Sequence, residues 1–309
     1  MNSNPYVSII VPVYNGDEHF HSCVSSLLMI DFPNNKLQVI LVNDGSTDNT
    51  AQWLYEQKLP SYFECITHNK NKGRASARNT GLKLTQGDII IFLDADMVVK
   101  PDFVIQHIKA ISKPEVVAVS GKVISKPCQP KTVLQKYLFD YQRRGAKQFG
   151  ENNPIPFNYL ITNNMSVKRK VVDECGLFND KYIGYGGEDT DYAIRLWELY
   201  PTGLRYSSKA ISLDYQNETL PNLLIKMEKY GSTNYLRLLK NYPKHINALG
   251  GNWIFSLKGY LIFNIIVKRI VTMAMFIVSF PPFVRYLIAY GLIVGARNPE
   301  EGVPKFRSK

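Results

Sequence analysis

The sequence predicts an α/β fold, in which a mostly parallel sheet is flanked by helices and followed by a helical C-terminal extension. Three observations lead to this prediction. Short runs of branched apolar residues alternate with amphipathic segments over the first 125 residues. The connections between them are short, which favours a parallel sheet wrapped by helices. The last third of the chain differs in composition, because it is basic, apolar and aromatic.

The order of the expected elements can be read directly along the chain. Strands are predicted at residues 6–13, 37–42, 62–67, 89–93 and 116–124, and a strand or hairpin at 160–168. Helices are predicted at residues 17–29, at 74–84, and from the turn at 43–48 to about residue 57. Two further helices are predicted to begin at Lys100-Pro101, with proline in the first turn, and at Glu188.

A polar turn follows each of the first four predicted strands. These turns are Tyr14-Asn15, Asp44-Gly45, Asn71-Lys72-Gly73 and Asp94-Ala95-Asp96. Ligands of open α/β sheets bind outside the carboxyl ends of the strands, so the four turns predict a nucleotide site. Neither a Gly-x-Gly-x-x-Gly nor a Walker A sequence occurs, which leaves dinucleotide and P-loop sites without support.

Two carboxylates, Asp94 and Asp96, end a strand that is predicted to be buried on both faces. On a straight strand they would point to opposite sides, so they converge only if the chain bends, which the small Ala95 permits. Converging carboxylate oxygens suit Mg²⁺ or Mn²⁺ bound to phosphates. The alternative is a solvated acidic pair at a strand-to-loop junction.

A glycine- and tyrosine-rich loop precedes a second acidic pair, Glu188-Asp189. A carboxylate here can serve as a general base for an attacking hydroxyl. Gly184, Gly186 and Gly187 would let the backbone approach a substrate, and Tyr182 and Tyr185 would stack on it; a surface loop and ordinary packing are the alternatives.

Asn163 and Asn164 precede this loop in the chain. Their side-chain amides would hydrogen-bond substrate hydroxyls, which would place them with Tyr185, Gly186 and Gly187 in an acceptor site. Asparagine also favours turns, and turn formation is the competing interpretation.

The net charge of +11 is carried almost entirely by the C-terminal third. Residues 1–203 contain 22 Lys and Arg against 21 Asp and Glu, whereas residues 204–309 contain 15 against 5. Such a region predicts an anionic membrane surface or nucleic acid as partner. The cations are interleaved with long aliphatic runs, which disfavours nucleic acid.

Residues 220–242 are predicted to form an amphipathic helix, and residues 253–296 are unusually apolar. The longest charge-free run, residues 270–284, has 15 residues and is shorter than the roughly 20 that a spanning helix needs. We therefore expect helices that lie in the bilayer interface. A buried helical subdomain, an oligomer interface, and a span broken at Pro281-Pro282 remain as alternatives.

The cysteines and histidines give no metal pattern. Cys23, Cys65, Cys128 and Cys175 form no Cys-x-x-Cys, which argues against structural zinc and suits a reducing compartment. The polar N-terminus shows no signal peptide. The five histidines have no metal spacing, and surface positions are expected for all of them: His19, His21, His68, His107 and His245.

Five segments resemble, in the same order, the motifs of family 2 glycosyltransferases, which have the GT-A fold, a Rossmann-like fold. They are residues 7–15, residues 42–48, Asn71-Lys72-Gly73 with residues 77–81, Asp94-Ala95-Asp96, and residues 186–189. Together they cover about residues 6–242. The resemblance implies a nucleotide-sugar donor, most often UDP-linked, and inversion at the anomeric carbon.

The resemblance also implies roles for individual residues. Pro12, Tyr14 and Asn15 would line the base and ribose. Asp44 would accept a hydrogen bond from the base, and Arg78 would lie near base or phosphate, with Asn71 and Gly73 in the same motif. Asp94 would contact ribose or the water shell of the metal, Ala95 would lie between the two carboxylates, and Asp96 would bind Mn²⁺ or Mg²⁺. Asp189 would be the general base, with Glu188 beside it on the acceptor.

The chain departs from the family pattern at two places. Family members often have a histidine after the last core strand as a further metal ligand, and here Asp214 stands near that position, as a ligand or a surface residue. The Gln-x-x-Arg-Trp motif of processive members does not occur, so we expect addition of single sugars. We predict a catalytic domain at residues 1–219, with a donor half at about 1–125 and an acceptor half at about 126–219, and an extension at 220–309.

The favoured function is an inverting, metal-dependent glycosyltransferase, peripheral or monotopic at the cytoplasmic face of the membrane. It would act on a glycan or lipid-linked acceptor in surface polysaccharide or glycoconjugate synthesis. Two alternatives remain. One is a nucleotide-sugar-binding pseudo-enzyme that scaffolds an assembly complex, and the other is a nucleotidyltransferase on a similar sheet.

Overall fold

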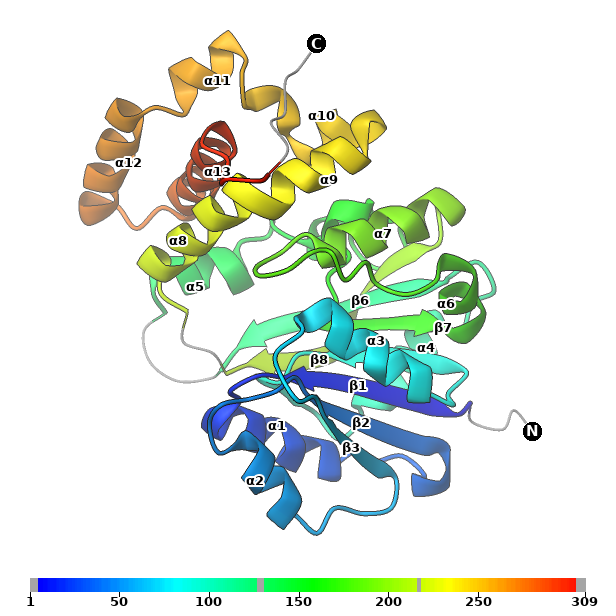
Figure 1. The fold of residues 1–309 in the computed structure, drawn as a ribbon. Coiled ribbons are helices and arrows are strands. Elements are labelled where there is room, and N and C mark those ends of the chain that lie inside the picture. Colours follow the sequence, from blue (N-terminus) through cyan, green and yellow to red (C-terminus); the bar gives the residue numbers. More distant parts are fainter. Residues whose placement is uncertain (1–4, 127–130, 216–217, 304–309) are drawn as a thin grey trace. The chain divides into compact units, whose positions relative to one another are not determined.

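The computed structural model describes residues 5–126, 131–215 and 218–303, which belong to two compact units (Figure 1). Unit 1 comprises Met1–Pro127, Gln142–Ile183 and Glu188–Gln216. Unit 2 comprises Cys128–Tyr141, Gly184–Gly187 and Asn217–Lys309. Unit 2 thus contains two short segments, 128–141 and 184–187, from within the residues 1–219 that the sequence predicts as the catalytic domain.

Unit 1 is built on an eight-stranded sheet with the order β3-β2-β1-β4-β7-β6-β8-β5. Its strands are β1 (Val7–Val13), β2 (Leu37–Asn43), β3 (Phe63–Thr67), β4 (Ile89–Leu93), β5 (Met97–Val99), β6 (Ala118–Ser125), β7 (Asn164–Lys168) and β8 (Leu204–Asp214). The predicted α/β class and each predicted strand are confirmed, whereas β5 and β8 are additional.

The sheet is mixed rather than uniformly parallel. The strands β1 to β4 pair in parallel, as their short helical connections require. The strand β7 lies antiparallel between β4 and β6, and β5 pairs antiparallel with β8. The sequence does not reveal this, because β7 inserts between two strands that precede it in the chain.

Helices cover both faces of this sheet (Figure 1). They are α1 (Asp17–Leu28), α2 (Thr50–Glu56), α3 (Arg74–Leu84), α4 (Phe103–Ile111), α6 (Arg169–Cys175) and α7 (Glu188–Leu199), with short 3₁₀ turns η1 (Asn34–Lys36), η3 (Ala146–Phe149) and η4 (Phe157–Tyr159). The helix α4 begins later than predicted, since Pro101 lies in the turn before it.

Side-chain alternation along the strands decides which helix lies on which face. Ile9 of β1 joins a buried core with Phe20 of α1 and Phe103 of α4. Its neighbour Ile10 faces the other way, where a Cβ on Gly81 of α3 would stand 2.5 Å from its Cγ2 atom. The helix α3 therefore packs on the face of the sheet opposite α1 and α4.

Unit 2 is helical in its described part. Its segments are α5 (Val133–Gln135), η2 (Lys136–Asp140), α8 (Leu220–Tyr230), η5 (Gly231–Tyr235), α9 (Leu236–Asn241), η6 (Pro243–His245), α10 (Ile246–Leu249), η7 (Gly251–Trp253), α11 (Leu257–Ile262), α12 (Ile265–Ile277) and α13 (Pro281–Arg297). The predicted helix over residues 220–242 forms, with the π-helical turn η5 in its middle.

The helix α13 packs closely against α8 and η5. A Cβ on Gly231 would stand 2.2 Å from the carbonyl oxygen of Leu292, and one on Gly295 would stand 2.1 Å from that of Glu228. Pro281 and Pro282 begin α13 rather than interrupt a helix, as proline at the first turn commonly does. Within residues 5–126, 131–215 and 218–303, we find no helix whose length and hydropathy would carry it across a bilayer.

Candidate functional site

The turns after β1, β2 and β3 meet at one edge of the sheet. The side-chain oxygen of Asn15 accepts a hydrogen bond from the backbone N–H of Thr47 at 2.8 Å. The backbone N–H of Asn15 donates to the hydroxyl of Ser46 at 2.9 Å. Gly45 has φ +68°, and a Cβ there would stand 2.3 Å from the carbonyl carbon of Lys70. The predicted convergence of polar turns is therefore present in the structure.

Asp44 is buried and ties the turn after β2 to the start of α3. Its Oδ1 accepts the Lys72 N–H at 3.0 Å and lies 2.7 Å from His68 Nδ1, while its Oδ2 accepts the Gly73 N–H at 2.8 Å. The other ring nitrogen of His68 lies 2.9 Å from the hydroxyl of Thr80. The surface position expected for His68 is wrong, because this histidine is part of the support for Asp44.

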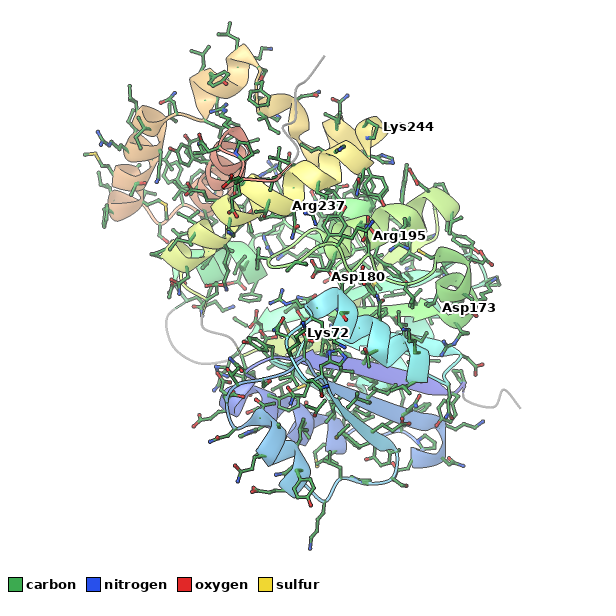
Figure 2. The ribbon with its side chains drawn as sticks, viewed as in Figure 1. Lys72, Asp173, Asp180, Arg195, Arg237 and Lys244 are labelled. Carbon is green, nitrogen blue, oxygen red and sulfur yellow. The ribbon has the colours of Figure 1, made fainter. Side chains whose placement is uncertain are left out.

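The remaining residues predicted to bind the nucleotide lie around these turns. Tyr14 is 47% exposed and Asn71 is exposed, so both side chains are accessible. Pro12 is half-buried within β1, and Gly73 caps α3 with φ +90°. Their predicted contacts with base and ribose stay predictions. Lys72, labelled in Figure 2, belongs to the same turn and is exposed.

The guanidinium of Arg78 joins the two acidic pairs. Its Nη2 donates to Asp94 Oδ1 at 2.9 Å, and its Nη1 donates to Glu188 Oε1 at 3.2 Å and to Asp189 Oδ1 at 3.1 Å. The Arg78 side chain is only 1% exposed. Burial alone would lower its pKa, but the carboxylates of Asp189, Asp94 and Glu188 outweigh that effect and raise it. Acidic residues more than 90 positions apart in the chain thus face one another across one cation.

The two carboxylates of the second pair have different surroundings. Asp189 is 25% exposed in its side chain and accepts a 2.5 Å hydrogen bond from the hydroxyl of Thr162. Glu188 is buried, and its Oε2 has no hydrogen-bond partner among the described residues. Burial and the neighbouring charge of Asp189 raise the pKa of Glu188 to about 6, although Arg78 opposes the shift. Asp189 is therefore the more accessible of the two for a substrate hydroxyl.

The first turn of α7, which carries Glu188 and Asp189, is held in place by contacts of residues further along the same helix. Arg195, one turn further along and labelled in Figure 2, donates from Nε to Asp191 Oδ2 at 3.1 Å and from Nη1 to the carbonyl oxygen of Cys175 at 2.7 Å. Phe92 of β4 packs against Phe178 and Tyr192. Asp191 thus has a structural role, as acidic first-turn residues of helices often do.

Asp96 occupies the bend that the sequence predicts. The N–H of Met97 donates to the carbonyl oxygen of Asp94 at 3.1 Å, and the Asp96 carbonyl accepts the N–H of Tyr215 at 3.1 Å. The pairing of β5 with β8 sets Met97 opposite Asp214. Burial, Asp94 and then Asp214 raise the pKa of Asp96 to about 7.

These carboxylates fit a divalent cation that also binds the substrate. One Asp96 oxygen, Oδ1, is buried and has no hydrogen-bond partner among the described residues. Mg²⁺ is often held by one or two carboxylates with the remaining positions filled by phosphate and water. Asp96 with Asp94 supplies such a pair.

The structure does not support a preformed metal site made of all three predicted ligands, Asp94, Asp96 and Asp214. In the described part of the chain, no three His, Cys, Asp or Glu side chains are arranged to hold a metal ion. Asp94 already accepts a hydrogen bond from Arg78, and Asp214 lies at the end of β8, where it acts on Asp96 as a neighbouring charge. The prediction of Asp214 as a direct third ligand therefore lacks support from this geometry.

The predicted acceptor residues are only partly accessible. Asn164 is fully buried, and its side chain bonds to His107, Ser212 and the Ala210 carbonyl. The prediction that Asn164 binds a sugar is therefore wrong; its amide connects β7, α4 and β8. His107 is buried too, and burial lowers its pKa to about 4, although the Asn164 hydrogen bond opposes this.

The other residues predicted to bind the acceptor differ in the exposure of their side chains. The Asn163 side chain is half-buried, and its carbonyl accepts the Asp94 N–H at 3.2 Å. Tyr182 is 2% exposed, so stacking on a sugar is excluded in this conformation. In unit 2, Tyr185 is half-buried with Lys226 Nζ 5.8 Å from its ring centre, and the Gly186 carbonyl accepts from Asn234 at 2.9 Å. Gly187, with φ +100°, leads into Glu188.

Sequence reasoning missed Thr162 and Arg74. Arg74 opens α3 one turn before Arg78. Desolvation and the charge of Arg78 would lower the pKa of Arg74, yet the carboxylates of Asp94, Glu188 and Asp189 raise it. The spacing of the two arginines, i and i+4, was a usable signal, because it puts both on one face of a helix. No local sequence pattern indicated that Thr162 would contact Asp189.

A sheet edge that brings two carboxylate pairs together beside polar turns, in an α/β sheet flanked by helices, is the arrangement of the GT-A fold. Over residues 8–176 the chain matches the family model described as Glycosyl transferase family 2, and it belongs to this family. The glycosyltransferase fold predicted from the five motifs is thereby confirmed.

Curated relatives agree with this assignment. The uncharacterized glycosyltransferase YfnE of Bacillus subtilis is 30% identical, and the match covers 61% of this chain and 59% of that protein. Poly-beta-1,6-N-acetyl-D-glucosamine synthase of Staphylococcus epidermidis is 25% identical over 76% of this chain and 56% of its own length. The chain thus matches somewhat more than half the length of these relatives.

Solved structures show the same fold at lower identity. The mannosyltransferase PcManGT from Pyrobaculum calidifontis, in complex with GDP-Man and Mn²⁺, is 16% identical with a TM-score of 0.64, over 96% of this chain and 88% of that one. The S. aureus TarS 1-349 structure in complex with UDP-GlcNAc is also 16% identical, with a TM-score of 0.55, over 94% and 89%. At this identity the likeness is one of fold.

Proposed function

We propose that this chain transfers one sugar per reaction from a nucleotide sugar, most often UDP-linked, to a hydroxyl of a glycan or lipid-linked acceptor, with inversion. The observation that carries the proposal is the position of Arg78, which holds Asp94 of the donor turn and Asp189 of α7 on one guanidinium. A donor bound over the first and a hydroxyl bound at the second would be within reach of each other.

In this proposal Asp189 is the general base. Its side chain is partly exposed, and Thr162 and Arg78 both donate to its Oδ1, which leaves Oδ2 to receive the hydroxyl proton. A carboxylate within hydrogen-bond reach of an attacking hydroxyl is sufficient for this role. Glu188, buried beside it, is a positioning residue that shares Arg78.

The donor would be held by the turns after β1 to β4. Asp96 with Asp94 would hold Mn²⁺ or Mg²⁺, and a divalent cation would neutralise the departing diphosphate. The structural neighbour with GDP-Man and Mn²⁺ and the one with UDP-GlcNAc support a sugar nucleotide of this general kind. The curated polymer synthases support an acceptor in surface polysaccharide synthesis.

The Asp189→Asn variant tests this assignment. We expect loss of transfer by about 10²-fold or more, because the general base is removed, with UDP-sugar binding retained. Transfer is measured with a panel of UDP-sugars and Mn²⁺, and binding by calorimetry. Asp173→Asn, at an exposed carboxylate of α6 labelled in Figure 2, is the matched control and should leave both unchanged. Normal turnover by Asp189→Asn would refute the assignment.

We further propose that the reaction takes place at the cytoplasmic face of a membrane, to which the basic and apolar region 220–309 would attach the enzyme. Support comes from composition: no Asp or Glu lies between Glu228 and Glu300.

A further inference from the structure

The solvent-facing side of α12 is apolar. Ile266, Ile270, Met273 and Ile277 follow one another at intervals of three and four residues, so they form one stripe along the helix. Each is between 59% and 85% exposed, and none of the residues of α12, all of which the structure describes, is buried. An amphipathic helix of a globular protein normally turns such a stripe inward.

Further exposed apolar residues lie on α11 and near the end of α12. Leu257 and Leu261 of α11 are 76% and 64% exposed, and Phe276 near the end of α12 is 87% exposed. Scattered single hydrophobic residues on a surface are ordinary, but a contiguous group of this kind marks an interaction site. We call these residues of α11 and α12 the apolar face.

The opposite side of α12 is anchored within unit 2. Met275 packs against a buried cluster that includes Leu134 and Val284, and Lys268 Nζ lies 5.1 Å from the ring centre of Tyr290 on α13. The helix is therefore held by its inner side, and its orientation presents the apolar face to the surroundings. Figure 1 shows α11 and α12 as successive helices beside α13.

Exposed cations accompany the apolar face. Lys258, Arg269 and Arg285 are exposed, and within the described residues none of the three makes an ion pair or side-chain hydrogen bond. Long cationic side chains at the margin of an apolar surface can reach lipid phosphates while their stems stay among apolar groups. The pattern matches that of helices lying in a membrane interface.

A recess in unit 2 shows the same combination of groups. A cavity of about 420 Å³ is lined mainly by apolar and aromatic side chains, including Trp253, Phe263 and Tyr286, and Arg285 is its one charged lining residue among those described. Such a lining accommodates part of an apolar chain beneath an anionic group.

We propose that unit 2 docks on an anionic lipid bilayer through the apolar face, with α11 and α12 lying parallel to the membrane at the level of the headgroups. This deepens the membrane attachment in the proposed function and is independent of the transfer chemistry. A second copy of the chain is a poorer occupant, because it would oppose cations to cations. A spanning arrangement does not fit either, since the 13 residues of α12 extend about 20 Å, less than the roughly 30 Å of a bilayer core.

Flotation of the full-length protein with lipid vesicles tests this docking surface. We expect binding to vesicles of phosphatidylglycerol and phosphatidylcholine, and weaker binding to phosphatidylcholine alone. The double variant Ile270→Glu/Met273→Glu should bind about a hundredfold more weakly, because two apolar side chains leave the interface and two negative charges enter it. Both positions are more than half exposed, so the fold should persist. Tyr55→Glu, at a 91% exposed residue of α2, is the matched control.

A charge variant tests the lipid headgroup contribution separately. Lys258→Gln/Arg269→Gln/Arg285→Gln should reduce binding to anionic vesicles about a hundredfold and remove most of its salt dependence, since each cation near such a surface contributes separately. Equal binding by wild type and both variants would overturn the proposal. So would a concentration-dependent dimer, seen by sedimentation, that the double glutamate variant abolishes while no vesicle binding occurs. Donor hydrolysis in solution is measured in parallel, so a failure of docking is distinguished from a failure of catalysis.

Discussion

At the residue scale, Arg78 is the most consequential side chain of unit 1. A buried guanidinium is tolerated only when its charge is compensated, and here three carboxylates surround it. Without Arg78, Glu188 would be a buried anion next to Asp189 that has lost its ion-pair partner. The same side chain therefore supports folding and sets the geometry of the proposed site.

Replacing Arg78 should be strongly destabilising. We expect Arg78→Met to lower the free energy of unfolding by about 3–5 kcal/mol, because one partner of a buried ionic cluster is removed and the others remain. Lys131→Met is the control: its ion pair with Asp140 is 38% and 49% exposed at the two side chains, and its loss should cost less than about 1 kcal/mol. Chemical denaturation of both variants measures the difference, and equal losses would contradict this account.

Glu188 should make stability depend on pH. Its pKa is about 6 in the folded protein against a usual 4.5, so the folded state binds the proton more tightly than the unfolded state. This contribution to stability is present below pH 4.5 and is lost as the pH rises through about 6. Glu188→Gln should therefore be more stable than wild type at pH 8 by about 2 kcal/mol and nearly equal to it at pH 4.5. Thermal unfolding at both pH values checks this, and a variant less stable at pH 8 would contradict it.

The chemistry of single residues was more predictable than their partners. The acidic residues of both pairs were identified because turns and helix starts carry local patterns. The roles of Thr162, His68 and Asn164 were missed or wrong, because their contacts with Asp189, Asp44 and His107 join residues 27, 24 and 57 positions apart. A local sequence pattern cannot indicate which distant side chain a buried hydroxyl, imidazole or amide will contact in the folded protein.

At the element scale, the turn after β2 depends on a close approach that only glycine allows. Gly45 has a positive φ, and its α-carbon lies against the backbone of Lys70 and Asn71. This contact brings the turn after β2 against the turn after β3, where the side chain of Asp44 then receives backbone N–H groups. The edge of the sheet at which we propose nucleotide binding is therefore assembled by backbone packing as much as by polar side chains.

Gly45→Ala should separate these two turns. We expect a loss of about 2–4 kcal/mol, since the added Cβ meets backbone at 2.3 Å in addition to the strain of a positive φ. Gly176→Ala has a similar φ of +78° and nothing within 4 Å of the new Cβ, so it should lose only the contribution of backbone strain and be less destabilising than Gly45→Ala. Unfolding curves and UDP affinity measure both. Equal losses of stability would show that the close approach is unimportant.

The elements that the sequence revealed are those with strong apolar periodicity. The strands β1, β2 and β4 and the helices α1, α3 and α7 fall within a few residues of their predicted bounds. The strand β5 has three residues and directly follows the acidic turn, so it carries no pattern of its own. The antiparallel insertion of β7 depends on pairing with strands that lie far away in the chain, which periodicity does not encode.

At the scale of the whole molecule, unit 2 has its own packing, so a substitution within it should affect unit 2 and leave the sheet of unit 1 largely unchanged. The helices α8 and α13 touch through glycines, and Gly295 has the shortest approach. Gly295→Ala should loosen this helix pair, because its Cβ would stand 2.1 Å from the Glu228 carbonyl oxygen. We expect faster amide hydrogen exchange in α8 and α13 and little change in β1 to β4. Gly291→Ala, on the same helix with 3.3 Å to its nearest atom, is the control.

The pairing of β5 with β8 has a consequence for the order in which a nascent chain completes its sheet. Met97 emerges from the ribosome long before Asp214, and the Asp96 carbonyl waits for the N–H of Tyr215. The strands β1 to β4 can assemble early, since their connections are short. The acidic bend at residues 94–96 is locked only when more than a hundred further residues have been synthesised, so catalytic competence should arise late during translation.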